Sequence, residues 1–247
     1  MFKHETQVIK FLLQWYSVNA RNLPWRKKNT LNLPDPYFVF VSEYMLQQTT
    51  VNTVKNKFND FILKWPSLNK LAQTSEPNIL KFWSGLGYYS RARNLLKSAK
   101  IIHKNFKNNI PKTYDELIQL PGIGDYTAKA ILGIGFNQSV MPLDANIERI
   151  LVRLYAIDKP INKVKNKLKD LGKKFISDKY SSNLIQSFMD YGSEICLPRN
   201  PKCNICGINK FCQSYKKNLQ QKIPFKQKKK SNKPRSEERR VGKECER

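Results

Sequence analysis

The sequence predicts an all-α protein, and three observations support this fold class. Apolar residues recur every three or four positions through most of the chain, as expected of helices with one buried face. Strand signals are weak because the alternation of apolar and polar residues is short wherever it occurs. The segments between the helical stretches are short and contain Pro, Gly or Asn, which is typical of helical domains.

The helical pattern is clearest in three segments, and a fourth helix has a start signal. The spacing of apolar residues predicts helices over residues 2–20, 71–83 and 91–102. Thr113 and Glu116 in TYDELIQL have the spacing of a capping box, so a helix is expected to begin there.

The charge of the chain limits the kinds of partner it can have. The 247 residues include 45 Lys and Arg against 19 Asp and Glu, a net charge of +26. Such an excess opposes compaction unless a polyanion is the usual partner, so nucleic acid is expected, with a membrane surface as the alternative. The sequence shows no transmembrane run or signal peptide pattern, which predicts a soluble cytoplasmic, nucleoid-associated protein with reduced thiols.

The C-terminal part of the sequence differs in composition from the rest. Residues 216–234 are basic and poor in apolar residues, which indicates a linker. In residues 235–247 Arg suddenly replaces Lys, and we interpret this stretch as sequencing-adapter sequence at the end of a gene fragment. The natural protein is therefore expected to continue further.

Four of the five cysteines lie in one segment, CLPRNPKCNICGINKFC. They are Cys196, Cys203, Cys206 and Cys212, with the spacing C-x6-C-x2-C-x5-C. Four thiolates can hold either structural zinc or an iron–sulfur cluster. Zinc ribbons usually have two C-x2-C pairs and this segment has one, so the spacing modestly favours the cluster.

The segment LIQLPGIGDYTAKAI joins two helical stretches through a turn that contains Gly122 and Gly124. Glycines let a backbone approach its ligand closely, and the N–H groups at the start of the next helix attract phosphate. The alternative is a plain helical hairpin in which the glycines serve packing. The basic composition favours DNA phosphate.

Together these motifs resemble a known family. LPGIGDYTA, PLDANIERIL and the four-cysteine segment resemble the helix-hairpin-helix, Gly/Pro-Asp, iron–sulfur DNA glycosylases, while SEYMLQQTTV and WSGLGYYSRARNL are similar to their MutY-type adenine-specific branch. The resemblance covers residues 12–212. It implies a six-helix barrel domain over 29–141, a [4Fe–4S] cluster domain formed by 1–28 and 142–215, and an active site in the cleft between them.

The resemblance also implies an activity and its catalytic residues. The expected enzyme is a monomeric glycosylase that flips adenine out of double-stranded DNA, opposite 8-oxoguanine or guanine, and hydrolyses its N-glycosidic bond. Glu43, by resemblance, protonates the adenine, Asp144 stabilises the sugar cation and Asn146 orients the sugar. Taken alone, Glu43 reads as an ordinary early-helix carboxylate and Asp144 as a helix N-cap. Tyr126 occupies the position of the Schiff-base lysine in bifunctional relatives, and a phenol cannot form that bond, so a monofunctional enzyme is expected.

Further residues are assigned to DNA or base contacts by the same resemblance. Gln47, Gln48 and Tyr88 are expected to wedge into the base stack, and Arg26 to line the adenine pocket. The run Arg91, Arg93, Lys97 and Lys100 is interpreted as a solvated helix side, with a phosphate-binding face as the alternative.

Three rival functions remain, one of which is a redox-active DNA-binding protein whose cluster transfers electrons; the residues argue against the other two. The first is an endonuclease III-like pyrimidine glycosylase and lyase, against which Tyr126 and the paired glutamines argue. The second is a non-catalytic DNA-binding module with a structural metal, against which Glu43 and Asp144 argue.

Overall fold

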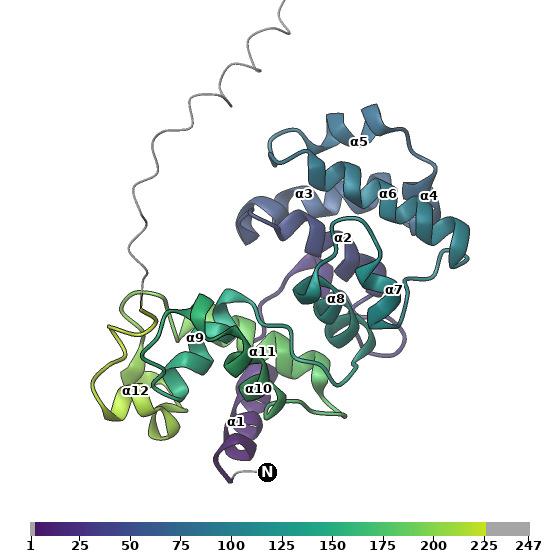
Figure 1. The fold of residues 1–247 in the computed structure, drawn as a ribbon. Helices are drawn as coiled ribbons and strands as arrows, with labels where there is room; N and C mark the ends of the chain where they lie inside the picture. The colour runs from purple at the N-terminus through teal and green to yellow at the C-terminus, as the bar shows by residue number, and fades with distance from the viewer. Residues whose placement is uncertain (1–2, 226–247) are drawn as a thin grey trace, which may run out of the picture.

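The structure is a computed structural model that describes residues 3–225, and every regular element in that range is helical (Figure 1). The helices are α1 Lys3–Asn19, α2 Pro36–Leu46, α3 Val51–Lys64, α4 Leu68–Ala72, α5 Glu76–Trp83, α6 Ser90–Asn105, α7 Tyr114–Ile118, α8 Asp125–Ala130, α9 Ala145–Leu154, α10 Lys165–Lys173, α11 Ser181–Glu194 and α12 Gln213–Lys216. Within these residues the pairing of extended backbone is limited to an isolated bridge between Lys28 and Pro34. The predicted all-α class is confirmed.

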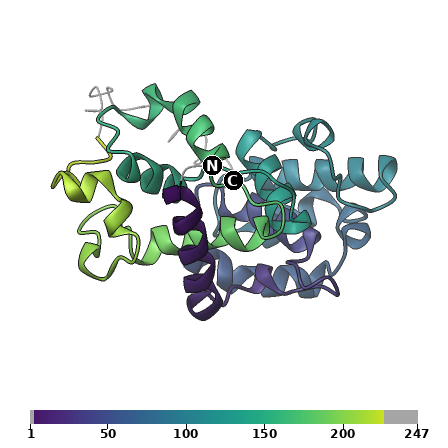
Figure 2. The same ribbon diagram turned by 90° about the horizontal axis from the view of Figure 1, so that it is seen from below.

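The helices form two groups. Helices α2 to α8 gather on one side, and α1 gathers with α9 to α12 on the other (Figure 1). Helix α1 crosses α11 (Figure 2), and α11 also packs on α9. The first helix therefore belongs with the last third of the chain, and the backbone passes between the groups twice.

Two predicted helices agree with the structure, and one does not. Helix α1 covers nearly all of 2–20, and α6 contains 91–102. The single helix predicted over 71–83 is wrong, because α4 ends at Ala72 and α5 starts at Glu76. Pro77 lies in the first turn of α5, where its missing N–H does no harm. Because proline is disfavoured in the interior of a helix, Pro77 marks the start of a second helix at Glu76.

The predicted helix starts have the expected caps. The Thr113 hydroxyl accepts the N–H of Glu116 at 3.3 Å and lies 2.6 Å from the Glu116 carboxylate. Asp144 accepts the N–H of Ile147 at 2.7 Å, which makes it the N-cap of α9. Local sequence signals thus place both helix starts.

Helix α6 does not present all its basic residues to solvent. Arg93, Lys97 and Lys100 are exposed, in agreement with the predicted solvated side. Arg91 is 5% exposed, so that interpretation is wrong for it. The reason is that Arg91 follows directly on the loop after α5 and lies on the same face as Leu95 and Ala99, which are buried.

The turn between α7 and α8 is held by close backbone packing. Gly122 has φ +82°, and a Cβ there would lie 2.9 Å from the Asn94 amide nitrogen and 3.1 Å from the Tyr44 ring. The Tyr44 hydroxyl donates to the carbonyl oxygen of Pro121 at 2.5 Å. Glycine is therefore required at 122 by its conformation and by lack of space, while Gly124 has open space around its Cβ position.

A π-helical turn, Ile131–Gly135, follows α8 and brings the two helix groups together. A Cβ on Gly133 would lie 2.3 Å from the Ile185 side chain of α11, and one on Gly135 would lie 3.2 Å from Pro36 of α2. The backbone thus approaches α2 and α11 closely at the same turn.

The described chain continues beyond α12. Ile223 lies in the segment assigned to the linker by composition, yet it is fully buried, and its carbonyl oxygen accepts the Arg153 Nε–H at 2.8 Å. Residues 226–234 of the predicted linker and the interpreted adapter sequence at 235–247 fall outside the described residues. Between residues 3 and 225, no helix combines the length and apolarity needed to cross a bilayer.

Candidate active site and cysteine cluster

A pocket of about 660 Å³ lies where the two helix groups meet. Helix α2 and the start of α8 line one side of the pocket. The start of α9 and the middle of α11 line the other side. The predicted site residues that line it are Arg26, Glu43, Gln47, Gln48, Tyr126, Asp144 and Asn146. Residues far apart in the sequence therefore converge on one cavity of the size usual for small-ligand sites.

Glu43 lies on α2 and is 6% exposed. The helix is started by Asp35, whose carboxylate accepts the Tyr37 N–H at 2.8 Å, and by Pro36 at its first position. Burial raises the pKa of Glu43 to about 8, and the negative charge of Asp144 also raises it, while a hydrogen bond with Tyr126 lowers it. Glu43 is therefore a carboxylic acid that stays protonated near neutral pH.

Asp144 is the second carboxyl group of the pocket and has a different environment. Burial raises its pKa, but the N–H of Ile147 at 2.7 Å, the Asn146 amide at 2.7 Å and the charge of Arg149 all act against that rise. Three favourable partners support the ionised form. The two carboxyl groups can thus hold different protonation states at the same pH.

Tyr126, from the first turn of α8, lies beside the two carboxyl groups. Its hydroxyl is hydrogen-bonded to Glu43. Burial raises the pKa of Tyr126 well above its ordinary value, and the charges of Glu43 and Asp144 raise it further. Tyr126 therefore remains a neutral phenol that holds the Glu43 carboxyl in place.

A chain of hydrogen bonds joins Asp144 to the cysteine segment. Arg149 Nη2 donates to the Asn146 side-chain oxygen at 2.8 Å, and Arg149 Nε donates to the carbonyl oxygen of Cys196 at 2.7 Å. Gly192 of α11 lies against Asn146, where an added Cβ would be only 2.6 Å from the Asn146 Cβ. Asn146 is therefore fixed from three sides.

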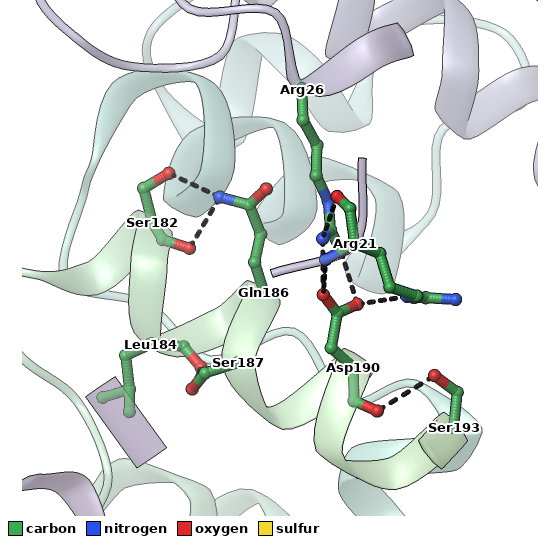
Figure 3. Close-up of polar contacts among 8 residues, drawn as sticks. All are labelled: Arg21, Arg26, Ser182, Leu184, Gln186, Ser187, Asp190 and Ser193. Atoms are coloured by element: carbon green, nitrogen blue, oxygen red, sulfur yellow. Dashed lines mark hydrogen bonds and ion pairs between the residues drawn. The ribbon is translucent and has the colours of Figure 1, made fainter. Parts of the chain in front are cut away.

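Arg26 is held by a buried carboxylate. Arg21 and Arg26 both bind Asp190 of α11, with nitrogen–oxygen distances of 2.6 Å (Figure 3). Burial alone would raise the pKa of Asp190, but Arg26 and Arg21 outweigh it and hold the pKa below its usual value. Both arginines line the pocket with their positions fixed by one anion.

Gln186 is a pocket residue that the sequence interpretation missed. Its amide nitrogen donates to the carbonyl oxygen of Ser182 at 3.0 Å and to the Ser182 hydroxyl at 3.1 Å (Figure 3). Its amide oxygen is buried without a protein partner, so it can accept a hydrogen bond from a ligand. Gln186 and Asp190 are one helical turn apart, and two buried polar residues at that spacing in α11 were an available signal.

Tyr88, Gly122 and Gly124 do not line the pocket, and Gln47 and Gln48 line it at its edge. Tyr88 is 64% exposed. Gln48 is exposed at the mouth of the pocket, and Gly122 and Gly124 are exposed on the turn between α7 and α8. The Gln47 side-chain amide donates to the carbonyl oxygen of Gly122 at 3.2 Å, which joins the pocket edge to that turn.

The four predicted cysteines line one pocket beside α9. Among residues 3–225, no three His, Cys, Asp or Glu side chains are arranged to hold a single metal ion. Arg153 Nη1 donates to the Cys196 sulfur and the Tyr191 hydroxyl donates to the Cys206 sulfur, both at 3.3 Å. The four thiols therefore share one cavity, and two of their sulfurs accept hydrogen bonds.

Comparison with protein families gives the affiliation of the chain. Residues 41–174 match the profile of the HhH-GPD superfamily base excision DNA repair proteins. The chain belongs to this superfamily. The matched HhH-GPD region contains Glu43, Tyr126 and Asp144, and therefore the chemical centre of the pocket.

The chain is similar in sequence to curated proteins over most of its own length. It is 42% identical, over 90% of its length, to a protein named adenine DNA glycosylase from Buchnera aphidicola subsp. Schizaphis graminum, and covers 63% of that protein. It is 35% identical to the adenine DNA glycosylase of Homo sapiens over 90% of its own length and 42% of the human protein. The chain thus spans less than two thirds of the length of these relatives.

Solved structures support the same HhH-GPD architecture. A thermostable thymine-DNA glycosylase matches with a TM-score of 0.77 and 26% identity, over 87% of this chain and 98% of the other. An endonuclease III–DNA complex matches with a TM-score of 0.68 at 20% identity, over 89% of this chain and 99% of the other. The second likeness concerns the fold alone.

Proposed function

We propose that this chain removes adenine from A:8-oxoguanine and A:G mispairs in double-stranded DNA, as a monomeric and monofunctional glycosylase. The observation that carries the proposal is the pair of carboxyl groups in the pocket, with Glu43 buried beside Tyr126 and Asp144 surrounded by hydrogen-bond donors. The names of the curated relatives support the same choice of base.

The proposed reaction divides the work between the two carboxyl groups. Glu43 gives its proton to a ring nitrogen of the flipped adenine while the N-glycosidic bond breaks and its electron pair goes to the base. Ionised Asp144 stabilises the oxocarbenium ion left on the sugar. Water then adds to the sugar carbon, and its released proton returns to Glu43, which leaves an abasic site.

Residues around the pocket provide recognition in this proposal. The unpartnered Gln186 oxygen accepts a hydrogen bond from the exocyclic amine of adenine, which guanine and thymine do not carry at the same position. Asp190 holds Arg26 at the pocket wall. The exposed turn with Gly122 and Gly124 contacts a DNA phosphate, while Gln48 and Tyr88 fill the space left by the flipped base.

A single-turnover assay on a panel of duplexes tests the proposed function. We expect release of adenine from A:8-oxoguanine and A:G duplexes but not from A:T, with strand breakage only after alkali because Tyr126 cannot form a Schiff base. A Tyr126→Lys variant assayed in parallel shows whether a lysine at this position produces strand breakage without alkali. Cleavage of a thymine glycol duplex without alkali would instead place the protein with the pyrimidine glycosylase/lyases. Tight binding without any base release would leave only a DNA-binding module.

We propose further that Cys196, Cys203, Cys206 and Cys212 hold a [4Fe–4S] cluster. The spacing with a single C-x2-C pair supports this choice over a zinc ribbon, and the four cysteines line one cavity in which Arg153 and Tyr191 donate to two of the sulfurs. When bound, a cluster of this kind supplies a rigid, electron-rich centre beside Arg153 and a fixed shape for the surrounding loop. In this proposal the domain formed by 1–28 and 142–215 contains the cluster, and the barrel domain over 29–141 contains the turn with Gly122.

Metal analysis tests the cluster assignment. Protein reconstituted without oxygen should contain about four iron and four sulfide per chain and show the visible absorbance of iron–thiolate centres. Cys206→Ala should lower the iron content and the absorbance, because it removes one ligand. The matched control is Cys245→Ala, which changes the fifth cysteine and should leave both values unchanged. Stoichiometric zinc in place of iron, or equal iron in both variants, would contradict the assignment.

A further inference from the structure

Arg91 is a buried cation near the N-terminus of α6. It is 5% exposed, although arginine is rarely buried unless it is paired. No carboxylate within residues 3–225 forms a salt bridge with it. Its partners are instead backbone carbonyl oxygens, which suggests a role in holding loops.

The guanidinium joins two separate segments. Nη1 donates to the carbonyl oxygens of Tyr44 at 3.3 Å, Met45 at 2.7 Å and Gln47, and Nη2 donates to those of Leu86 at 2.8 Å and Gly87 at 3.0 Å. The first three carbonyls end α2, where a helix leaves its last carbonyl groups unpaired. The other two belong to the loop between α5 and α6. One side chain therefore fixes the ends of both segments.

These two segments carry Gln48 and Tyr88 in similar, unfavourable backbone conformations. Gln48 has φ 60° and Tyr88 has φ 47°, in the left-handed region that side chains other than glycine rarely adopt. The Arg91 guanidinium carbon lies 5.7 Å from the centre of the Tyr88 ring and 5.5 Å from that of Trp83. The cation thus contacts the Tyr88 ring as well as the backbone before it.

We infer that Arg91 is a positioning residue that holds the Gln48 and Tyr88 loops in the geometry that replaces a flipped base, and so sets the rate of base extrusion. The inference rests on the proposed function. Because the loops are held before DNA binds, their conformational entropy and strain are not added to the energy of unstacking the base. Lysine keeps the charge but has a single nitrogen, so it cannot span both sets of carbonyl oxygens.

The test compares two substrates in single-turnover adenine release. For Arg91→Lys we expect a loss of about 30-fold on an A:G duplex, which corresponds to about 2 kcal/mol at 1.4 kcal/mol per tenfold. On a duplex with adenine opposite a stable abasic-site analogue, where the base is unpaired and extrusion is easier, the loss should shrink to within about 3-fold. A merely structural role would lower both rates equally, and equal losses would overturn the inference.

Two further variants keep the result interpretable. Arg93→Lys is the matched control, because Arg93 lies on the same helix in an exposed pair with Glu76 at 2.8 Å, and it should stay within about 2-fold on both substrates. Tyr88→Ala combined with Arg91→Lys should lose less on the A:G duplex than the product of the two single losses, because in the Tyr88→Ala background Arg91 still holds only the Gln48 segment; fully multiplicative losses would contradict positioning of Tyr88 by Arg91. Wild-type protein that releases no adenine would reject the proposed function, whereas active wild type with an unchanged substrate ratio would reject only the role of Arg91.

Discussion

Replacement of Glu43 by Gln is expected to lower single-turnover adenine release from an A:G duplex by about 10²-fold to 10⁴-fold, the usual contribution of a positioned general acid. Glutamine has nearly the same shape and can keep a hydrogen bond with Tyr126, but it cannot donate a proton to the leaving base. DNA binding should change little, since Glu43 is 6% exposed and lies inside the pocket. The measurement is the rate of adenine release together with the DNA dissociation constant.

The pKa of about 8 gives this prediction a pH signature. Because the proposed reaction uses the protonated form of Glu43, the wild-type rate should hold up to about pH 8 and then fall by about tenfold per pH unit. The free energy of unfolding should also decrease as pH rises. Between pH 4.5 and about 8 the Glu43 carboxyl keeps its proton in the folded state and loses it in the unfolded state, so the contribution of Glu43 to stability declines over this range. Glu43→Gln should therefore melt no lower than wild type at pH 9.

A matched control for Glu43 is Glu5→Gln. Glu5 is also 6% exposed, but it lies on α1 and its carboxylate accepts the Tyr155 hydroxyl at 2.7 Å, away from the pocket. This variant should retain the wild-type rate. A Glu43→Gln enzyme with more than a tenth of the wild-type rate would mean that another group supplies the proton.

Replacement of Asp144 by Asn is expected to separate catalysis from folding. Asn is about as good an N-cap as Asp, so the unfolding free energy should change by less than about 0.5 kcal/mol. The negative charge that we propose stabilises the sugar cation is lost, however, and adenine release should fall by about 10³-fold. Denaturant unfolding and single-turnover kinetics on the same samples measure the two effects.

Asp144→Ala provides the comparison, because it removes the cap as well as the charge. It should lose about 1 kcal/mol of stability and be as inactive as the Asn variant. If the Asn variant kept its activity, the carboxylate would be only the N-cap that its 2.7 Å hydrogen bond with Ile147 indicates.

Local sequence signals were enough for much of the fold. The apolar spacing of 2–20 and the caps at Thr113 and Asp144 depend on neighbouring residues, and they correspond to elements in the structure. The break between α4 and α5 was missed because Leu71 and Ile79 have helical spacing across the polar stretch QTSEPN, although Ser75 and Pro77 mark the new start. Grouping α1 with α11 requires a contact between distant segments, and the family resemblance, not the spacing, predicted it.

Some pocket residues could be predicted from local sequence motifs, and others could not. Glu43, Tyr126 and Asp144 lie in recognisable motifs, and the structure brings them to one cavity. Asp190 was missed because its importance depends on Arg21 and Arg26, which are distant in the sequence. Gln186 was missed because its partner Ser182 lies one turn earlier in α11, and only the packing of α11 beside α2 and α9 makes it a pocket residue. Arg91 was assigned to the solvated side because its carbonyl partners come from the end of α2 and from the loop between α5 and α6, and no residue type in the sequence identifies a backbone acceptor.

The pairing of α1 with the last third of the chain has a consequence during protein synthesis. Helices α2 to α8 are contiguous, so their group can fold on the ribosome while the remainder is still being translated at about 5–20 residues per second. Helix α1 must wait for α11 before its apolar face is covered. Glu43 and Tyr126 are made and placed early, whereas Asp144 and Gln186 reach the pocket only when the second group closes. A nascent chain should therefore acquire the loops for holding DNA before it acquires a complete reaction centre.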